Sequence, residues 1–185
     1  GRSYLVHLPA GYDPSEPWPL ILTFHGWGQN GQSLATATHF DAARAISIYP
    51  DGAPSKAPNQ NKKAWAPAPY ANTSGSEDLE FVDEIINSAR RTWNIDDSQL
   101  FAVGFSNGGG FAQYLACQRP AQFQAIATVS AAYYTAVVEK CAPGAVGHLD
   151  IHGTADQIVS YDGGTRHNTK FLSVPEIMSV EVARW

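Results

Sequence analysis

The chain has 185 residues, of which 44% are hydrophobic and 16% charged, values typical of one globular domain. Its formal net charge of −5 comes without any run of like charges, which argues against nucleic acid or an anionic membrane surface as a partner. No apolar stretch reaches the roughly 18 to 20 residues that cross a bilayer, and the first residues lack the pattern of a signal peptide. We therefore expect a single soluble domain over residues 1–185.

Strand-like and helix-like patterns alternate along the chain. The apolar run between Pro19 and Gly26 is typical of a buried strand, and Ser74 with Glu77 forms a capping box before apolar residues at helical spacing. Residues 53–75 form a loop long enough to be either disordered or functional. In chain order, the predicted elements are strands at 4–8 and 20–24, a short helix at 40–45, a strand at 46–49, a helix at 75–93, a strand at 100–103, a helix at 107–118, strands at 125–129 and 147–151, and a last helix capped by Ser173 that runs to 185.

This alternation predicts an α/β fold: a mostly parallel sheet with helices on both faces, in which ligands bind at the carboxyl ends of the strands. We find no internal repeat and no linker between domains. The chain stops inside a predicted helix, which is an unusual place for a domain boundary. We therefore expect this single domain to be truncated at its C-terminus.

Ser106 is the candidate nucleophile. It stands in the run Gly104-Phe105-Ser106-Asn107-Gly108, between a predicted strand and a predicted helix. A sharp turn at this point would force unusual backbone angles on the serine, and the flanking glycines would remove side chains that clash. Ester hydrolysis needs such a nucleophile, a base for its proton and dipoles for the oxyanion. The alternative role for Ser106 is to cap the helix.

The backbone N–H groups of Asn107 and Trp27 are the candidate oxyanion donors. Asn107 directly follows the serine, and Trp27 lies in His25-Gly26-Trp27-Gly28 after the buried strand, where the glycines let the backbone approach a ligand. An ordinary glycine turn is the alternative for this segment. His25 is a candidate base, but its place at the end of a buried strand favours a structural histidine.

Asp156 is the candidate acid that orients the catalytic base. It follows the predicted strand at 147–151 by a few residues, in a loop at the carboxyl edge of the sheet. Asp150 lies inside that strand, and Asp162 lies further along the loop beside Gly163. The alternative role for Asp156 is to cap its own loop.

Several blocks of the sequence occur together in one order. They are Tyr4-Leu5-Val6-His7-Leu8-Pro9, His25-Gly26-Trp27-Gly28, Tyr49-Pro50-Asp51-Gly52, Ala68-Pro69-Tyr70, Asp78-Leu79-Glu80-Phe81-Val82, residues 104–110, and His152-Gly153-Thr154-Ala155-Asp156. In this order they resemble carbohydrate esterase family 1, the secreted esterases that include fungal type C feruloyl esterases and polyhydroxybutyrate depolymerase-like enzymes. The resemblance implies an α/β-hydrolase fold, with Ser106 as nucleophile and Asp156 as acid. It also implies an oxyanion hole at Trp27 and Asn107, secretion, and feruloyl esters of plant cell-wall polysaccharide, such as xylan, as substrates.

The catalytic histidine is the departure from this family pattern. The family takes it from a loop well after the acid, and no residue of this chain matches that position. We therefore expect the histidine in a segment after Trp185. His167 fits the order Ser, Asp, His, but its place close behind Asp156 favours a surface or substrate-side histidine. Without an imidazole the rate of hydrolysis should fall by orders of magnitude.

Other residues carry smaller expectations. Cys117 and Cys141 form either a disulfide, which would close a loop of about 25 residues and add roughly 3 kcal/mol, or two buried thiols. Asn72-Thr73-Ser74 is a sequon for glycosylation. The loop residues Trp65 and Tyr70 either pack against a hydroxycinnamoyl ring or pin the loop to the core.

The sequence leaves the acyl specificity open. Acetylxylan esterase and polyester depolymerase are the close enzymatic alternatives to a feruloyl esterase. A carbohydrate-binding relative that lost the base is an alternative of a different class, and the intact Ser106 and Asp156 argue against it. We expect a monomeric serine esterase without metal or cofactor, acting on a small ester or a feruloylated polysaccharide.

Overall fold

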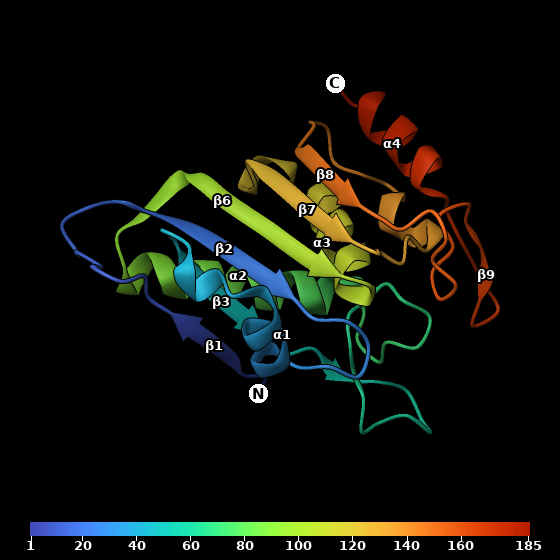
Figure 1. The fold of residues 1–185 in the computed structure, drawn as a ribbon, viewed down its shortest axis with the longest axis horizontal. Helices are drawn as coiled ribbons and strands as arrows, with labels where there is room; N and C mark the ends of the chain where they lie inside the picture. Colours follow the sequence, from blue (N-terminus) through green and yellow to red (C-terminus); the bar gives the residue numbers. More distant parts are fainter.

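The computed structural model describes all residues from Gly1 to Trp185 and contains one six-stranded sheet, shown in Figure 1. Its strand order is β1-β3-β2-β6-β7-β8. The strands are β1 (Tyr4–His7), β2 (Trp18–Phe24), β3 (Ile46–Pro50), β6 (Ile95–Phe105), β7 (Ala125–Val129) and β8 (Gly147–Ile151). Only β1 is antiparallel to its neighbour, so the predicted mostly parallel sheet is confirmed.

Helices pack on both faces of this sheet, as predicted. Helices α2 and α3 lie behind the sheet in the view of Figure 1, and α1 lies in front of it. The α-helices are α1 (Gly31–Thr38), α2 (Gly75–Thr92), α3 (Asn107–Gln118) and α4 (Val174–Val182). None of them combines the length and the hydropathy that crossing a bilayer requires.

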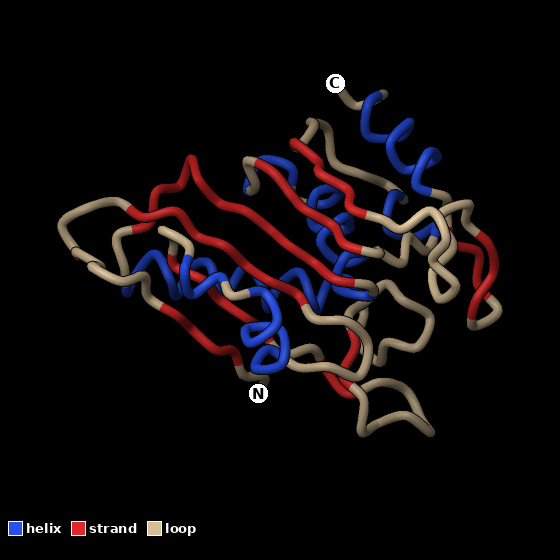
Figure 2. Tube along the Cα trace, in the orientation of Figure 1, coloured by secondary structure: helices blue, strands red, loops and turns tan.

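Two short antiparallel hairpins lie outside the main sheet (Figure 2). They are β4 (Ala53–Pro54) with β5 (Lys63–Ala64), and β9 (Gly164–Arg166) with β10 (Thr169–Phe171). The sequence showed no alternating pattern for either pair. The hairpins stand beside the carboxyl ends of the parallel strands, where the candidate site lies.

Helix α1 was not predicted, and three predicted boundaries differ from the structure by three residues or more. The short helix expected at 40–45 is a single 3₁₀ turn, Phe40–Ala42, because the chain becomes extended at Ala43 before entering β3. Strand β6 extends well beyond the predicted residues 100–103, since β2 pairs with it at Ile95 and, after an irregularity in the register, from Leu100 to Gly104. The last helix ends at Val182 and not at Trp185.

The two capping boxes that the sequence predicted are present. Ser74 accepts from the Glu77 N–H at the start of α2, and Ser173 accepts from the Glu176 N–H at the start of α4. Each glutamate in turn accepts from the backbone N–H of its serine, so both helix starts are satisfied locally.

The main core lies between the sheet and the pair α2 and α3. Phe24 of β2 meets the rings of Trp65 and Phe111 edge-on, and Trp65 stacks on Phe111 with 5.0 Å between ring centroids.

The opposite face of the sheet is less covered at β6, β7 and β8. Leu149 and Ile151 of β8 are 58% and 54% exposed, although their positions in the strand match the apolar pattern of a buried face.

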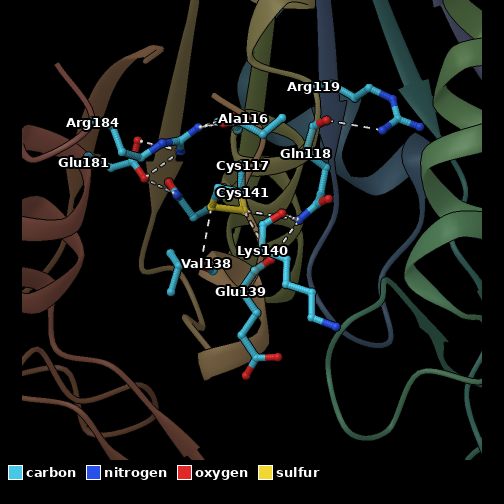
Figure 3. The surroundings of a disulfide bond; sticks show 12 residues. Ala116, Cys117, Gln118, Arg119, Val138, Glu139, Lys140, Cys141, Glu181 and Arg184 are labelled. Atoms are coloured by element: carbon cyan, nitrogen blue, oxygen red, sulfur yellow. Dashed lines mark hydrogen bonds and ion pairs between the residues drawn. A yellow bond between two sulfur atoms is a disulfide. The ribbon is translucent and has the colours of Figure 1, made fainter. Parts of the chain in front are cut away.

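A disulfide joins the end of α3 to the following loop, as Figure 3 shows. Cys117 and Cys141 have Cα atoms 4.5 Å apart and are separated by 24 positions in the sequence, so the bridge is confirmed and the two-thiol alternative is wrong. Gln118 donates to the Glu139 carbonyl at 2.9 Å beside it. Arg184, after α4, donates to the Ala116 carbonyl at 3.2 Å and so ties the last helix to the same corner.

Candidate active site

Ser106 lies at a sharp turn between β6 and α3. Its backbone has φ 53° and ψ −116°, values that a non-glycine residue rarely adopts. The strain is held by the Ser106 N–H, which donates to the Val129 carbonyl at 2.9 Å, and by the Ser106 carbonyl, which accepts from the Ala132 N–H at 3.0 Å. The side chain makes no capping hydrogen bond to α3, so the helix-cap alternative is wrong.

The glycines around Ser106 are required by close backbone contacts. A Cβ atom on Gly108 would lie 2.1 Å from the Phe24 carbonyl oxygen, and one on Gly104 would lie 2.1 Å from the Gly108 carbonyl oxygen. Strand β2, strand β6 and helix α3 therefore approach each other so closely that only glycine fits at these two positions. This is the geometry of a nucleophile elbow.

The loop after β2 presents Trp27 beside Ser106. Both residues line the same cavity. The backbone N–H groups of Trp27 and Asn107 take part in none of the loop, turn or side-chain hydrogen bonds of the chain, so they are free to donate to a ligand. Their assignment to an oxyanion hole remains a prediction.

His25 holds this loop and has no free nitrogen for catalysis. The ring is fully buried; Nε2 accepts from the Gly52 N–H at 2.9 Å, and Nδ1 lies 2.8 Å from the Gly26 carbonyl. Because Nε2 is an acceptor, we assign the proton to Nδ1, which then donates to that carbonyl. Burial lowers the pKa of His25, which favours this neutral form. His25 is therefore a structural histidine, as its position in the sequence favoured.

The Asn107 side chain clamps the long loop that precedes α2. Its Oδ1 accepts from the Trp65 N–H at 2.8 Å, and its Nδ2 donates to the Trp65 carbonyl at 3.0 Å. Asp78 of α2 holds the next residue, since its Oδ2 accepts from the Ala66 N–H at 2.7 Å. Arg2 pairs with the other oxygen of Asp78. The loop is thus fixed by buried polar groups and is not disordered.

The position of Trp65 rules out the expectation that this residue packs against a hydroxycinnamoyl ring of the substrate. Its side chain has no exposed surface and packs between Phe24 and Phe111, so a substrate cannot reach it. Trp65 pins the loop to the core, whereas Tyr70 lines the cavity at Ser106. The sequence could not separate these two aromatic residues because both lie in one irregular loop.

Asp156 is held as a carboxylate in the loop after β8. Its Oδ1 accepts from the N–H groups of Val159 at 3.0 Å and Ile158 at 2.8 Å, and these bonds lower its pKa. The other oxygen, Oδ2, lies 3.7 Å from His152 Nε2, which itself contacts the Val159 carbonyl at 2.7 Å. The Ser130 hydroxyl also lies close enough to the carboxylate to lower its pKa. Asp150 instead accepts from Thr128 and Tyr133 in a buried network.

His167 lies at the tip of the β9–β10 hairpin, over the cavity. With Asn168 it forms a two-residue turn in which both have positive φ, 53° and 54°. Its ring meets Trp27 and Tyr70 edge-on, at 5.3 Å and 4.9 Å between centroids. Burial lowers its pKa, so the neutral imidazole is favoured. The ring makes no hydrogen bond to Ser106 or Asp156.

The cavity at Ser106 has a volume of about 220 Å³, and its lining includes the aromatic rings of Trp27, Tyr70, Phe105 and Tyr134. Trp27 and Tyr70 stack with 4.5 Å between centroids, and Trp27 Nε1 donates to the Ser55 hydroxyl at 2.9 Å. The remaining lining includes residues that the sequence did not single out, because nothing in their local pattern marks them. They are Gln29, Phe105, Ala132, Tyr134, Ile158, Val159 and Arg166.

A mostly parallel sheet with a serine elbow and a glycine-flanked loop at its carboxyl edge defines the α/β-hydrolase class. The family model "Putative esterase" matches residues 2–169, and the chain therefore belongs to this esterase family. The fold is similar to that of the Bacillus cereus carboxylesterase, with a TM-score of 0.69 at 17% identity, covering 99% of this chain and 80% of that one.

Two fungal proteins are similar to this chain in sequence. "Feruloyl esterase C" of Emericella nidulans is 34% identical over 176 residues, which cover 94% of this chain and 62% of that protein. "Probable feruloyl esterase C" of Aspergillus terreus is 32% identical over 187 residues, which cover 100% of this chain and 66% of that protein. The chain thus spans less than two thirds of the length of these relatives.

Proposed function

We propose that this protein is a serine carboxylesterase that hydrolyses hydroxycinnamoyl esters, in particular feruloyl esters of plant cell-wall polysaccharide. The observation that carries the proposal is the strained Ser106 elbow, which opens into a cavity whose lining includes several aromatic rings. The names of the fungal relatives support the feruloyl group, and the aromatic side chains that line the cavity suit a planar aromatic acyl group.

In the proposed first step, Ser106 Oγ attacks the ester carbonyl while an imidazole takes its proton. The carbonyl oxygen becomes negatively charged in this step and accepts hydrogen bonds from the free N–H groups of Trp27 and Asn107. The imidazolium then gives the proton to the leaving alcohol, and the acyl group stays on Ser106. In the second step the imidazole deprotonates water, which attacks the acyl-enzyme and releases the acid and Ser106.

Asp156 is proposed to orient that imidazole through Oδ2, because Oδ1 is already occupied by two backbone N–H groups. None of the six histidines hydrogen-bonds to Ser106, and we propose that a segment after Trp185 supplies the base. His167 is the internal alternative, since it shares the cavity with Ser106. The disulfide fits an oxidising compartment, which supports secretion.

A fluorophosphonate probe tests whether Ser106 is activated. The expected result is a covalent adduct on Ser106 that the Ser106→Ala variant lacks, at a rate far below that of a complete triad when only this chain is present. Labelling that disappears in His167→Ala would assign the base to that residue. A folded chain with no adduct after prolonged exposure would reject an activated nucleophile and favour the carbohydrate-binding alternative.

Initial rates separate the enzymatic alternatives. We expect faster hydrolysis of methyl ferulate than of acetylated xylan or a short hydroxybutyrate oligomer. A higher rate on either of the other substrates would reject the feruloyl assignment while leaving the esterase mechanism intact.

A further inference from the structure

The cavity at Ser106 contains one positively charged side chain that has no acidic partner. Arg166, the last residue of β9, lines the cavity, and its Nη1 donates to the Ile158 carbonyl. It belongs to none of the ion pairs of the chain. A guanidinium has five N–H donors, so most of those on Arg166 remain free for a ligand.

Two phenol groups lie close to this guanidinium. Tyr70 and Tyr134 both line the cavity, and their rings meet edge-on with 6.2 Å between centroids. Burial raises the pKa of both phenols, and the positive charge of Arg166 opposes that rise at each of them. Both hydroxyls therefore keep their protons at neutral pH. The Tyr70 hydroxyl donates to that of Tyr134, so the Tyr134 proton is the one that is free for a ligand.

No aspartate or glutamate lines the cavity. Its lining therefore combines the donors of Arg166 and Tyr134 with the aromatic side chains of Trp27, Tyr70 and Phe105. An acyl ring packed against these aromatic side chains can place a hydrogen-bond acceptor, but not a cation, against Arg166. A hydroxyl, methoxy or phenolate oxygen on the ring has the matching chemistry.

We propose that Arg166 and Tyr134 are specificity-determining residues that select acyl groups whose aromatic ring carries oxygen substituents. The inference rests on the proposed esterase function, because it takes the cavity at Ser106 as the acyl site. It assigns a role to the β9–β10 hairpin, which places Arg166 at the cavity. An unsubstituted cinnamoyl ring would fill the same space but leave these donors without a partner.

Binding measurements in a Ser106→Ala background test the proposal without turnover. Methyl ferulate and methyl cinnamate share the ester and the side chain, and only the former carries ring oxygens. Titrations followed by ligand-observed NMR on the 185-residue chain should show methyl ferulate binding about tenfold more tightly, as expected for a hydrogen bond to a charged group. In Arg166→Met the preference for methyl ferulate should fall from about tenfold to about twofold or less. In Tyr134→Phe, which keeps the ring, it should fall to about threefold.

Lys170→Met is the matched control. Lys170 lies on the same hairpin, outside the cavity, and its contact to Glu176 at 3.8 Å is exposed, so the preference should not change. A further readout is pH: as the phenol of methyl ferulate ionises, its affinity should rise in the parent and stay level in Arg166→Met. A structural role alone for Arg166 would not produce that difference.

The proposal is overturned if the parent does not distinguish the two esters, or if folded Arg166→Met retains the parent's preference. If Arg166→Met does not fold, Tyr134→Phe becomes the test. An unchanged preference for methyl ferulate over methyl cinnamate in that variant would reject the proposed selection of oxygen-substituted rings. Failure of the esterase function itself is recognised separately, as the absence of a fluorophosphonate adduct on Ser106 in the unmutated chain.

Discussion

Replacing Asn107 by alanine is expected to loosen the loop at residues 53–74 while keeping the backbone N–H beside Ser106. The substitution removes both side-chain hydrogen bonds to Trp65, 2.8 Å and 3.0 Å long. Trp65 is fully buried and Asn107 is 3% exposed, so water does not reach the Trp65 N–H and carbonyl in their place. Each buried group left without a partner costs about 1–3 kcal/mol, and the two together should lower the free energy of unfolding by about 2–5 kcal/mol.

Urea denaturation followed by far-UV circular dichroism measures this change. For a chain of this length each kcal/mol corresponds to about 2–4 °C in melting temperature, so a loss of at least about 4 °C should accompany the lower urea midpoint. Asn72→Ala is the matched control, because Asn72 is exposed in the same loop and makes no side-chain hydrogen bond. Its stability should stay within about 0.5 kcal/mol of the parent.

A further consequence concerns the cavity. Tyr70 lies five positions after Trp65, so loosening the clamp should also weaken binding of methyl ferulate to the Asn107→Ala variant. A free energy of unfolding for Asn107→Ala within about 0.5 kcal/mol of the parent would contradict the stabilising role of the Asn107–Trp65 hydrogen bonds, since two unsatisfied buried groups would then be without energetic effect.

Three other perturbations test the framework around the site. Replacing Cys117 and Cys141 together by alanine should lower the free energy of unfolding by about 3 kcal/mol, measured by urea titration, and an unchanged midpoint would contradict the cross-link's role. Because burial holds the pKa of His25 below its usual 6.5, the unfolded chain binds more protons below about pH 6.5. The contribution of His25 to stability should therefore be full above that pH and fall as the pH drops below it, a fall that should shrink in His25→Gln. Gly108→Ala, whose Cβ would lie 2.1 Å from a carbonyl oxygen of β2, should lose at least about 4 kcal/mol or fail to fold. Gly153→Ala, with its nearest atom at 3.9 Å, should fold with nearly the parent's stability, and equal losses in the two variants would contradict the packing argument.

Local patterns predicted most of the fold correctly. The buried strand at β2, the helix at α3 and the capping boxes at Ser74 and Ser173 follow from the spacing of apolar residues and from side chains that bond to their own backbone. The extra length of β6 could not be predicted in this way, because its start depends on the pairing of Ile95 with Trp18 of β2, a residue far away in the chain, and residues 96–99 between the paired segments are polar.

The sequence by itself determined the elbow at Ser106, the carboxylate at Asp156 and the glycine-flanked loop at Trp27, since each depends on a few neighbouring residues. It did not distinguish Trp65 from Tyr70, and it gave no sign that Arg166 would line the same cavity as Ser106. Those facts depend on contacts between residues far apart in the chain, such as the clamp from Asn107 to Trp65 and the hairpin that brings Arg166 to the cavity. Only the tertiary structure decides such contacts, because the same short segment can face the core or the solvent according to what packs against it.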